Sequence, residues 1–401
     1  MNAYIVKAYR SAVGRAKKGG FRFFRSDDIA TNVIQHLMSQ VPEVTPEMVD
    51  DLIVGCANPE GEQGLQIARQ IALMALGKEV PGVTVNRYCA SGLETIAMAD
   101  AKIRAGMADI IIAGGTESMS MIPMTGYKLA PNYNTADKRP DYVVGMGITA
   151  EAVSKKWDVS RLDQDTFAFN SHQKAMKATA EGKFKDEIVP IKVKEVYVEN
   201  DQRKEREWTV DTDESIRPTT TVEGLGKLRP VFAAGGSVTA GNSSPMSDGA
   251  AFVMVMSERM VKQLKLEPIA RLVTCVSAGV EPIHMGIGPC AATPKALQRA
   301  GLTLNDAAWT MSGGNAVYNT DLSIAAGADQ TITITFTVDD AVSGVLDNYA
   351  EISDARDENG NEIDDIESTD DNDNTNDKPI KVTNMTSIFS KKVYLPTNIN
   401  R

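Results

Sequence analysis

The first 115 residues alternate short apolar runs with longer stretches in which apolar residues recur every three or four positions. The short runs predict strands at residues 3–8, 52–56, 82–85 and 109–113, the last of which ends at Gly114 and Gly115. Strands that are apolar along their whole length are buried on both faces, as in parallel sheets. This part of the chain therefore predicts an α/β fold with parallel strands.

The stretches between these strands carry the signals of helices. Ser26 stands where a capping residue would begin a helix, with apolar residues four positions apart along one face. Pro46 predicts a short helix, because proline favours the first helical position. Two further helices are predicted at residues 63–76 and 91–105.

The middle of the chain is less regular. Residues 118–268 contain more polar residues and several prolines and glycines. One helix is clear in this segment, at residues 161–181. We interpret the segment as an inserted loop domain.

The α/β pattern resumes at residues 270–280, and a helix is predicted to open at Thr293 and run through Arg299. Residues 302–306 then resemble residues 44–51, which precede a strand in the first part of the chain. An internal duplication of the α/β unit is the simplest explanation. In the second copy the corresponding strand does not follow, so this copy is predicted to be truncated.

The C-terminal part has a different pattern. Residues 331–338 alternate threonine with apolar residues, which is typical of a half-exposed antiparallel strand, and residues 348–352 predict a second strand. Residues 354–377 are rich in Asp, Asn and Glu, which predicts a loop or disorder. Counting back from Gly360 puts Ala355 where an EF-hand needs its first carboxylate, so a solvated acidic loop is favoured over a calcium site.

The net charge of −11 is confined to this C-terminal part. Residues 305–401 hold 18 acidic and 6 basic residues, whereas the preceding residues hold 35 acidic and 36 basic ones. No basic stripe occurs anywhere in the chain, which argues against a nucleic-acid partner.

Composition also limits the location and the metal chemistry. No run approaches the roughly 18 apolar residues of a membrane-spanning helix, and the N-terminal order of apolar then basic residues is the reverse of a secretory signal. We therefore expect a cytoplasmic location and no membrane partner. The cysteines are scattered, with no C-x-x-C pair, and the three histidines lie far from them, so neither a disulfide framework nor a metal site is expected.

Cys89 is the candidate with chemical meaning. It lies where a predicted buried strand meets a predicted helix, and the positive end of the helix dipole favours a thiolate there. A cysteine so placed is a credible nucleophile for acyl transfer. Most free cysteines are small buried apolar residues, and placement alone does not decide between these roles.

A resemblance to a known family favours the nucleophile. Residues 86–92 (NRYCASG) resemble the nucleophile motif of the thiolases, which include acetyl-CoA acetyltransferases and 3-ketoacyl-CoA thiolases. Four other segments resemble further motifs of that family: 114–120 (GGTESMS), 146–151 (MGITAE), 227–230 (KLRP) and 239–244 (TAGNSS). The resemblance is colinear over residues 1–306.

The resemblance implies that Cys89 attacks a 3-ketoacyl-CoA, releases acetyl-CoA and carries the shortened acyl group until a second CoA removes it; the reverse reaction is a condensation. It also implies that Met146, Ala240 and Ser244 line a pantetheine channel and that Arg217 lies near the CoA nucleotide. CoA would be a substrate, and no cofactor is implied. The relatives are homodimers or homotetramers. Residues 21–25 (FRFFR) and the lack of a histidine before Met146 favour a degradative enzyme over a biosynthetic one.

The late motifs of the family do not occur after Asp306. These are an Asn-Glu-Ala-Phe segment, a Gly-His-Pro segment with the activating histidine, and a Cys-x-Gly-x-Gly segment with a second catalytic cysteine. The other histidines and Cys290 are not expected to replace them: His36 and His172 lie on predicted helices and His284 on a loop. Because a missing general base typically costs about 10² to 10⁴ in rate, we expect the chain to be inactive as it stands.

The sequence thus predicts an α/β protein with an N-terminal thiolase unit (1–117), an inserted loop domain (118–268), a truncated second unit (269–306) and an unrelated, acidic, β-like and partly disordered tail (307–401). Part of that tail, residues 348–353 and 359–366, weakly resembles repeat modules of bacterial surface proteins. A gene fusion, a frameshift or an assembly error would join such a foreign segment to a thiolase. A non-catalytic acyl-CoA-binding protein on a thiolase scaffold is the alternative. A surface protein is disfavoured by the N-terminus, and a ketosynthase by the lack of two histidine partners.

Overall fold

The computed structural model describes residues 2–304 and, beyond them, short strands only. The chain divides into two compact units, Met1–Leu272 and Val273–Arg401. Among the described residues, no helix combines the length and the apolar character needed to cross a membrane.

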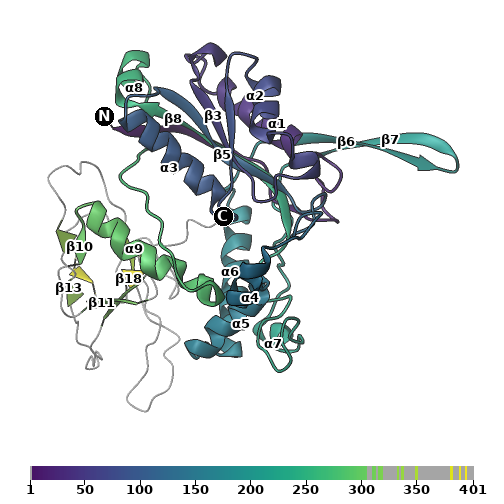
Figure 1. Ribbon diagram of the computed structural model, residues 1–401, viewed down its shortest axis with the longest axis vertical. Coiled ribbons are helices and arrows are strands. Elements are labelled where there is room, and N and C mark those ends of the chain that lie inside the picture. Colours follow the sequence, from purple (N-terminus) through teal and green to yellow (C-terminus); the bar gives the residue numbers. More distant parts are fainter. Residues whose placement is uncertain are drawn as a thin grey trace. The chain divides into compact units, whose positions relative to one another are not determined.

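The first unit is built on a seven-stranded sheet with the order β4-β3-β5-β8-β1-β9, in which β2 also pairs with β8 (Figure 1). Its strands are β1 (Ala3–Arg10), β2 (Gly14–Arg15), β3 (Asp51–Gly55), β4 (Gly82–Val85), β5 (Ile110–Ser118), β8 (Ser247–Ser257) and β9 (Ala270–Arg271). The pairs β3–β4 and β3–β5 are parallel. The pairs of β8 with β1, β2 and β5, and that of β1 with β9, are antiparallel.

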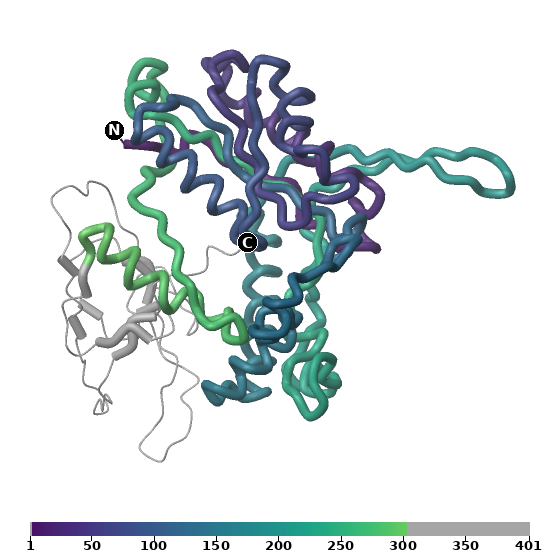
Figure 2. The backbone as a smooth tube through the Cα atoms, in the orientation of Figure 1, coloured from purple at the N-terminus to yellow at the C-terminus, as the bar shows by residue number. Residues whose placement is uncertain are grey.

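The sheet confirms the α/β class and corrects the prediction that its strands are all parallel. The correction comes from β8, which lies in the segment predicted to be a loop domain. Figure 2 shows its trace between those of β1 and β5, far from both in sequence. The β5 strand also continues through Gly114, where a Cβ atom would lie only 2.7 Å from the Cα atom of Phe252 on β8. At residues 270–280, where the α/β pattern was predicted to resume, the structure has only the two-residue strand β9.

Helices cover both faces of this sheet. The helices α1 (Ser26–Ser39) and α2 (Ile67–Ala75) pack in the larger core, α3 (Ser91–Arg104) packs in a smaller one, and α8 (Glu258–Leu264) follows β8. The prediction that Ser26 caps its helix is wrong. Arg25 holds the N-cap position, and the buried Ser26 hydroxyl has no hydrogen-bond partner among the described residues.

The helix predicted at residues 63–76 is shorter than expected. A 3-10 turn, η2 (Gly61–Gln63), precedes it, and α2 begins only at Ile67 because Leu65 and Gln66 adopt the left-handed backbone conformation. The short helix predicted at Pro46 is confirmed as η1 (Pro46–Met48).

The segment between β5 and β8 contains more structure than the pattern indicated. Its elements are α4 (Tyr133–Lys138), η3 (Pro140–Tyr142), α5 (Met146–Lys156), α6 (Arg161–Ala180), β6 (Ile191–Glu199), β7 (Gln202–Val210) and α7 (Val222–Gly226). The predicted helix at 161–181 is confirmed as α6, which begins with a capping box between Ser160 and Asp163. Figure 1 shows α4, α5, α6 and α7 gathered together and the hairpin β6–β7 extending away from the sheet.

The second unit opens with η4 (Pro282–Ile287) and α9 (Gly288–Arg299). The helix begins five residues before the predicted start and takes Pro294 into its interior. Beyond it lie the short strands β10 (Thr303–Leu304), β11 (Trp309–Ser312), β12 (Asn315–Tyr318), β13 (Ile332–Thr333), β14 (Phe336–Thr337), β15 (Asn348–Ala350), β16 (Ile380–Val382), β17 (Ile388–Phe389) and β18 (Val393–Tyr394).

The predictions for the tail are only partly within the described residues. The strands β13 and β14 fall in the range 331–338 and β15 in the range 348–352, and all three have antiparallel partners. The acidic segment 354–377 lies outside the described residues.

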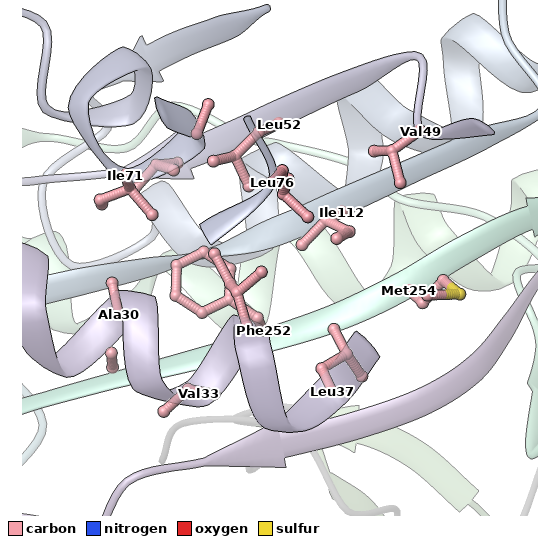
Figure 3. Close-up of a cluster of buried hydrophobic side chains, with 14 of the residues drawn as sticks. Ala30, Val33, Leu37, Val49, Leu52, Ile71, Leu76, Ile112, Phe252 and Met254 are labelled. Carbon is pink, nitrogen blue, oxygen red and sulfur yellow. The ribbon is translucent and has the colours of Figure 1, made fainter. Parts of the chain in front are cut away.

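The larger core lies between α1, α2 and the sheet. Figure 3 shows the ring of Phe252, from the middle of β8, beside Ala30 and Val33 of α1. Phe252 is only 1% exposed. Because β8 is a central strand, this side chain links the late segment of the unit to the helix that follows β1.

We predict that Phe252→Ala lowers the free energy of unfolding by about 3–5 kcal/mol, because it removes a buried ring and leaves a cavity in a closely packed core. Urea denaturation of the full chain measures this change. The control is Met107→Ala, whose side chain is 73% exposed, and its effect should stay within about 0.5 kcal/mol. Equal effects of the two substitutions would contradict the packing described for β8.

Candidate active site

The parallel strands β3, β4 and β5 end at one edge of the sheet. Ligand sites in α/β folds form at this carboxyl edge, where the loops that follow the strands come together. Here these loops begin at Cys56, Asn86 and Met119. Cys89 lies in the second of them, between β4 and α3.

Cys89 is exposed, at the end of a tight turn over residues 86–90. Tyr88, the preceding residue, has a φ of 47°. This left-handed conformation is unfavourable for a residue with a side chain. Ala90 is the N-cap of the 14-residue helix α3, and no side chain of the described residues caps it. The turn thus presents the thiol beside the positive end of a helix dipole.

The side chain of Ser91 stabilises this turn through hydrogen bonds to its backbone. Its hydroxyl accepts a hydrogen bond from the backbone N–H of Arg87 at 2.8 Å and donates one to the carbonyl of Tyr88 at 2.6 Å. The helix also lies directly on β3, since a Cβ atom at Gly55 would come within 2.6 Å of the carbonyl carbon of Ser91. Only glycine fits at this position of the strand.

Asn86 ties the turn to the neighbouring loop. Its Oδ1 accepts from the N–H of Tyr88 at 2.8 Å, and its Nδ2 donates to the carbonyl of Ala57 at 2.9 Å. The N–H of Cys56 also donates to the carbonyl of Val85, the last residue of β4. The turn over residues 86–90, which we call the nucleophile turn after the role predicted for Cys89, and the loop after β3 therefore form one hydrogen-bonded structure.

A cluster of buried polar groups lies under this structure. The Glu117 carboxylate accepts from the N–H of Ala57 at 2.6 Å and from the side-chain amide of Gln63. Burial raises the pKa of Glu117, while the bonds from Gln63 and from the backbone of Ala57 and Asn58 oppose that rise. Burial, and then the nearby charge of Glu117, raise the pKa of Cys56 to about 12. Cys56 is thus an inert thiol at neutral pH.

Two contacts link the turn to its surroundings. Arg87 forms an ion pair with Glu94 in the first turn of α3, at 2.9 Å. A hydrogen bond with the Tyr142 hydroxyl raises the pKa of Tyr88. Tyr142 is the last residue of η3, in the segment before α5.

The four predicted substrate-binding residues lie on exposed parts of the first unit. Met146 is the first residue of α5 and follows Tyr142 by four positions. Ala240 and Ser244 belong to one loop before β8, and Arg217 lies between β7 and α7.

A buried carboxylate holds the loop of Ala240 and Ser244. Asp165 on α6 is 2% exposed, accepts from Asn242 Nδ2 at 2.9 Å and pairs with Arg161 at 2.7 Å. Thr239, which is fully buried, accepts at its hydroxyl from the N–H groups of Gly241 and Asn242. Because the Asp165 carboxylate binds both Asn242 and Arg161, it fixes the shape of the loop. Ala240 and Ser244 lie at the surface of this loop.

Arg217 has a partner that the sequence did not suggest. Its backbone N–H donates to Nδ1 of His172 on α6, at 3.3 Å. Burial, and then the charge of Arg217, lower the pKa of His172. Nδ1 is therefore the unprotonated nitrogen, and the imidazole is neutral at physiological pH.

The remaining candidates lie apart from these groups in the chain. His36 stacks edge-on against Tyr9, with ring centroids 4.7 Å apart, in the packing of α1. His284 lies in η4 and Cys290 in α9, both in the second unit. No group of three or more possible metal ligands occurs among the described residues.

The sequence reasoning did not single out Glu117, Gln63 or Asp165. Glu117 stands inside the segment GGTESMS, and its position at the end of an apolar strand was a signal that could have been used. Asp165 resembles any solvated charge on a helix until its burial is known.

Comparison with known proteins extends these observations. The profile described as "Thiolase, N-terminal domain" matches residues 3–259, and that described as "Thiolase, C-terminal domain" matches residues 266–312. The 3-ketoacyl-CoA thiolase of Bacillus subtilis (strain 168) is 49% identical over 306 residues, which cover 76% of this chain and 78% of the relative. Proteins of the same name from Idiomarina loihiensis and Vibrio cholerae are 43% identical over 306 residues, 75% of this chain and 76% of each relative.

We predict that His172 titrates below its ordinary pKa of 6.5, because its site is partly buried and faces Arg217. The folded state then binds the proton less tightly than the unfolded chain, so the contribution of His172 to stability is present above pH 6.5 and is lost as the pH falls through the lowered pKa. An NMR titration of the histidine side chains measures the pKa of His172.

The same histidine in urea-unfolded protein is the reference for this titration. Arg217→Ala should move the pKa of His172 part of the way back to the unfolded value, since only one of the two causes is removed. A folded-state pKa at or above the unfolded one would contradict the geometry described for His172.

Proposed function

Since the chain belongs to the thiolase family, we propose that it forms an acyl-enzyme on Cys89 from a 3-ketoacyl-CoA, in the manner of an acetyl-CoA C-acyltransferase. The observation that carries this proposal is the exposed Cys89 in a left-handed turn at the amino end of α3. The exposed turn leaves the sulfur of Cys89 accessible to a substrate, as a nucleophile for acyl transfer must be. The substrate class rests on the names of the relatives.

In the proposed acylation, the Cys89 thiolate forms a bond to the ketone carbon of the substrate. The carbon–carbon bond next to it breaks, and its electron pair leaves with acetyl-CoA, which takes up a proton. The shortened acyl group remains on Cys89 as a thioester. The thiolate of a second CoA attacks this thioester, releases the shortened acyl-CoA and restores the free cysteine.

We further propose that this chain completes the cycle slowly. The family resemblance assigns the proton transfers to a late histidine and a late cysteine, and residues 307–401 contain neither residue type. Solvent must then accept and supply the protons. General acid–base groups typically contribute about 10² to 10⁴ in rate, so turnover should fall by a factor of that size while acylation of Cys89 persists.

The partners follow from the same reasoning. Acyl-CoA and CoA are the proposed substrates, with Met146, Ala240 and Ser244 along the pantetheine and Arg217 near the nucleotide. The exposure of all four residues and the rigid Asp165-bonded loop support these roles. A cytoplasmic location, a degradative direction and a homodimer or homotetramer are parts of the same proposal.

The test is to incubate the purified full chain with acetoacetyl-CoA and CoA. We expect peptide mass spectrometry to find an acetyl group on Cys89, and thiolysis to run about 10² to 10⁴ slower than that of the Bacillus subtilis relative assayed beside it. Cys89→Ala should abolish the acetylation and the residual thiolysis together.

Each other outcome is informative. Turnover equal to that of the relative, and lost in Cys89→Ala, would contradict the proposed slow cycle. Saturable acyl-CoA binding without any acylation of Cys89 would favour the alternative, a non-catalytic acyl-CoA-binding protein on a thiolase scaffold.

A further inference from the structure

Glu117 is a half-buried carboxylate that the proposed reaction does not use. It stands near the end of β5, at the same edge of the sheet as Cys89. Its two oxygens have different donors: the N–H of Ala57 at Oε2 and the amide of Gln63 at Oε1. Burying a charged group is costly unless its bonds are well made, so this placement requires an explanation.

The bonds of Glu117 lead to the nucleophile turn. Ala57 gives its N–H to Glu117 and its carbonyl to Asn86 Nδ2. Asn86 then accepts the N–H of Tyr88 at Oδ1. The donors in this series all point towards Glu117, and the amide of Asn86 carries two of its bonds. The series also fixes which way the Asn86 amide faces.

The far end of the series is the strained residue. Tyr88 has a φ of 47° and directly precedes Cys89. Residues with side chains leave the left-handed region unless their surroundings hold them there. Two groups bond to the backbone of Tyr88: Asn86 at its N–H and Ser91 at its carbonyl. The first of these depends on Glu117.

Gln63 makes the arrangement specific for a carboxylate. Its Oε1 accepts from the N–H of Ser118, and its Nε2 donates to the carbonyl of Asn58 as well as to Glu117. The side-chain amide of Gln63 therefore cannot rotate by half a turn without losing both of its hydrogen bonds to the backbone. The side chain at position 117 must accept one hydrogen bond from Ala57 and another from Gln63 at its two terminal atoms. A carboxylate can do this, whereas an amide has only one accepting atom.

We propose that Glu117 is a positioning residue for Cys89, which it holds at the amino end of α3 through the series Ala57, Asn86 and Tyr88. This role rests on the proposed function of Cys89 as the nucleophile. Glu117 acts through the turn and forms no bond with substrate. When the series is broken, Tyr88 relaxes, and Cys89 moves away from the amino end of α3.

The test is the rate at which iodoacetamide alkylates Cys89 in the full chain, followed for each cysteine by peptide mass spectrometry. Because it needs no substrate, a failed acylation assay and a failed positioning role remain distinguishable. We expect Glu117→Gln to slow alkylation of Cys89 about tenfold, the scale of one lost charge-assisted hydrogen bond. Alkylation of Cys275 and Cys290 should not change.

Two further variants separate positioning from a general loss of structure. Asn86→Ala should slow the reaction to a similar extent, and the double variant with Glu117→Gln should be no slower than the slower single one, because both break the same series.

The matched control is Glu214→Gln. Glu214 also accepts two backbone N–H groups, those of Arg15 and Gly20, each at 2.8 Å, but in a loop outside the series. It should leave alkylation of Cys89 unchanged. The proposal is overturned if Glu117→Gln keeps the original rate at Cys89, if the effects of Glu117→Gln and Asn86→Ala multiply, or if all four cysteines react faster.

Discussion

The close approach of α3 to β3 is the constraint on which the site depends. The backbone of Ser91 lies so near Gly55 that a single added carbon would overlap it. The chain must therefore leave β4 and enter α3 within the five residues 86–90, and Tyr88 takes the left-handed conformation to make this turn. Cys89 is exposed because it lies at the outside of that turn. The polar contacts of Ser91, Asn86 and Glu117 serve to hold it.

The sequence predicted the elements whose apolar residues face one core. The strands β3 and β4 and the helices α3 and α6 lie within a residue or so of their predicted bounds, because period and composition decide such elements. It also led to Cys89, since a strand–helix junction is a local feature. By contrast β8 was missed, although it is the central strand, because its surroundings are glycines, serines and prolines and its partners are over 100 residues away.

The parts of the site that could not be predicted depend on contacts between distant residues. Glu117 is 60 positions from Ala57, and Asp165 is 77 positions from Asn242. A carboxylate in a sequence is usually solvated. Only the fold shows that Asp165 is buried and Glu117 half-buried, each against specific hydrogen-bond donors. The prediction of the residue that caps α1 was wrong for a related reason. Ser26 is a good capping residue by type, yet the N-cap position falls one residue earlier, at Arg25.

The contacts that fix Cys89 come from residues 55–118, within the first unit. The groups that the family uses to move protons would come from segments after residue 306, where this chain differs from its relatives. These two requirements of the reaction are therefore carried by separate lengths of chain. The geometry of a nucleophile is set by the residues packed around its turn, whereas proton transfer needs a base within hydrogen-bond reach of the reacting atoms. Under the proposed function, we therefore expect a chain that keeps the first and lacks the second to form the thioester, while the steps that need a positioned base become slow.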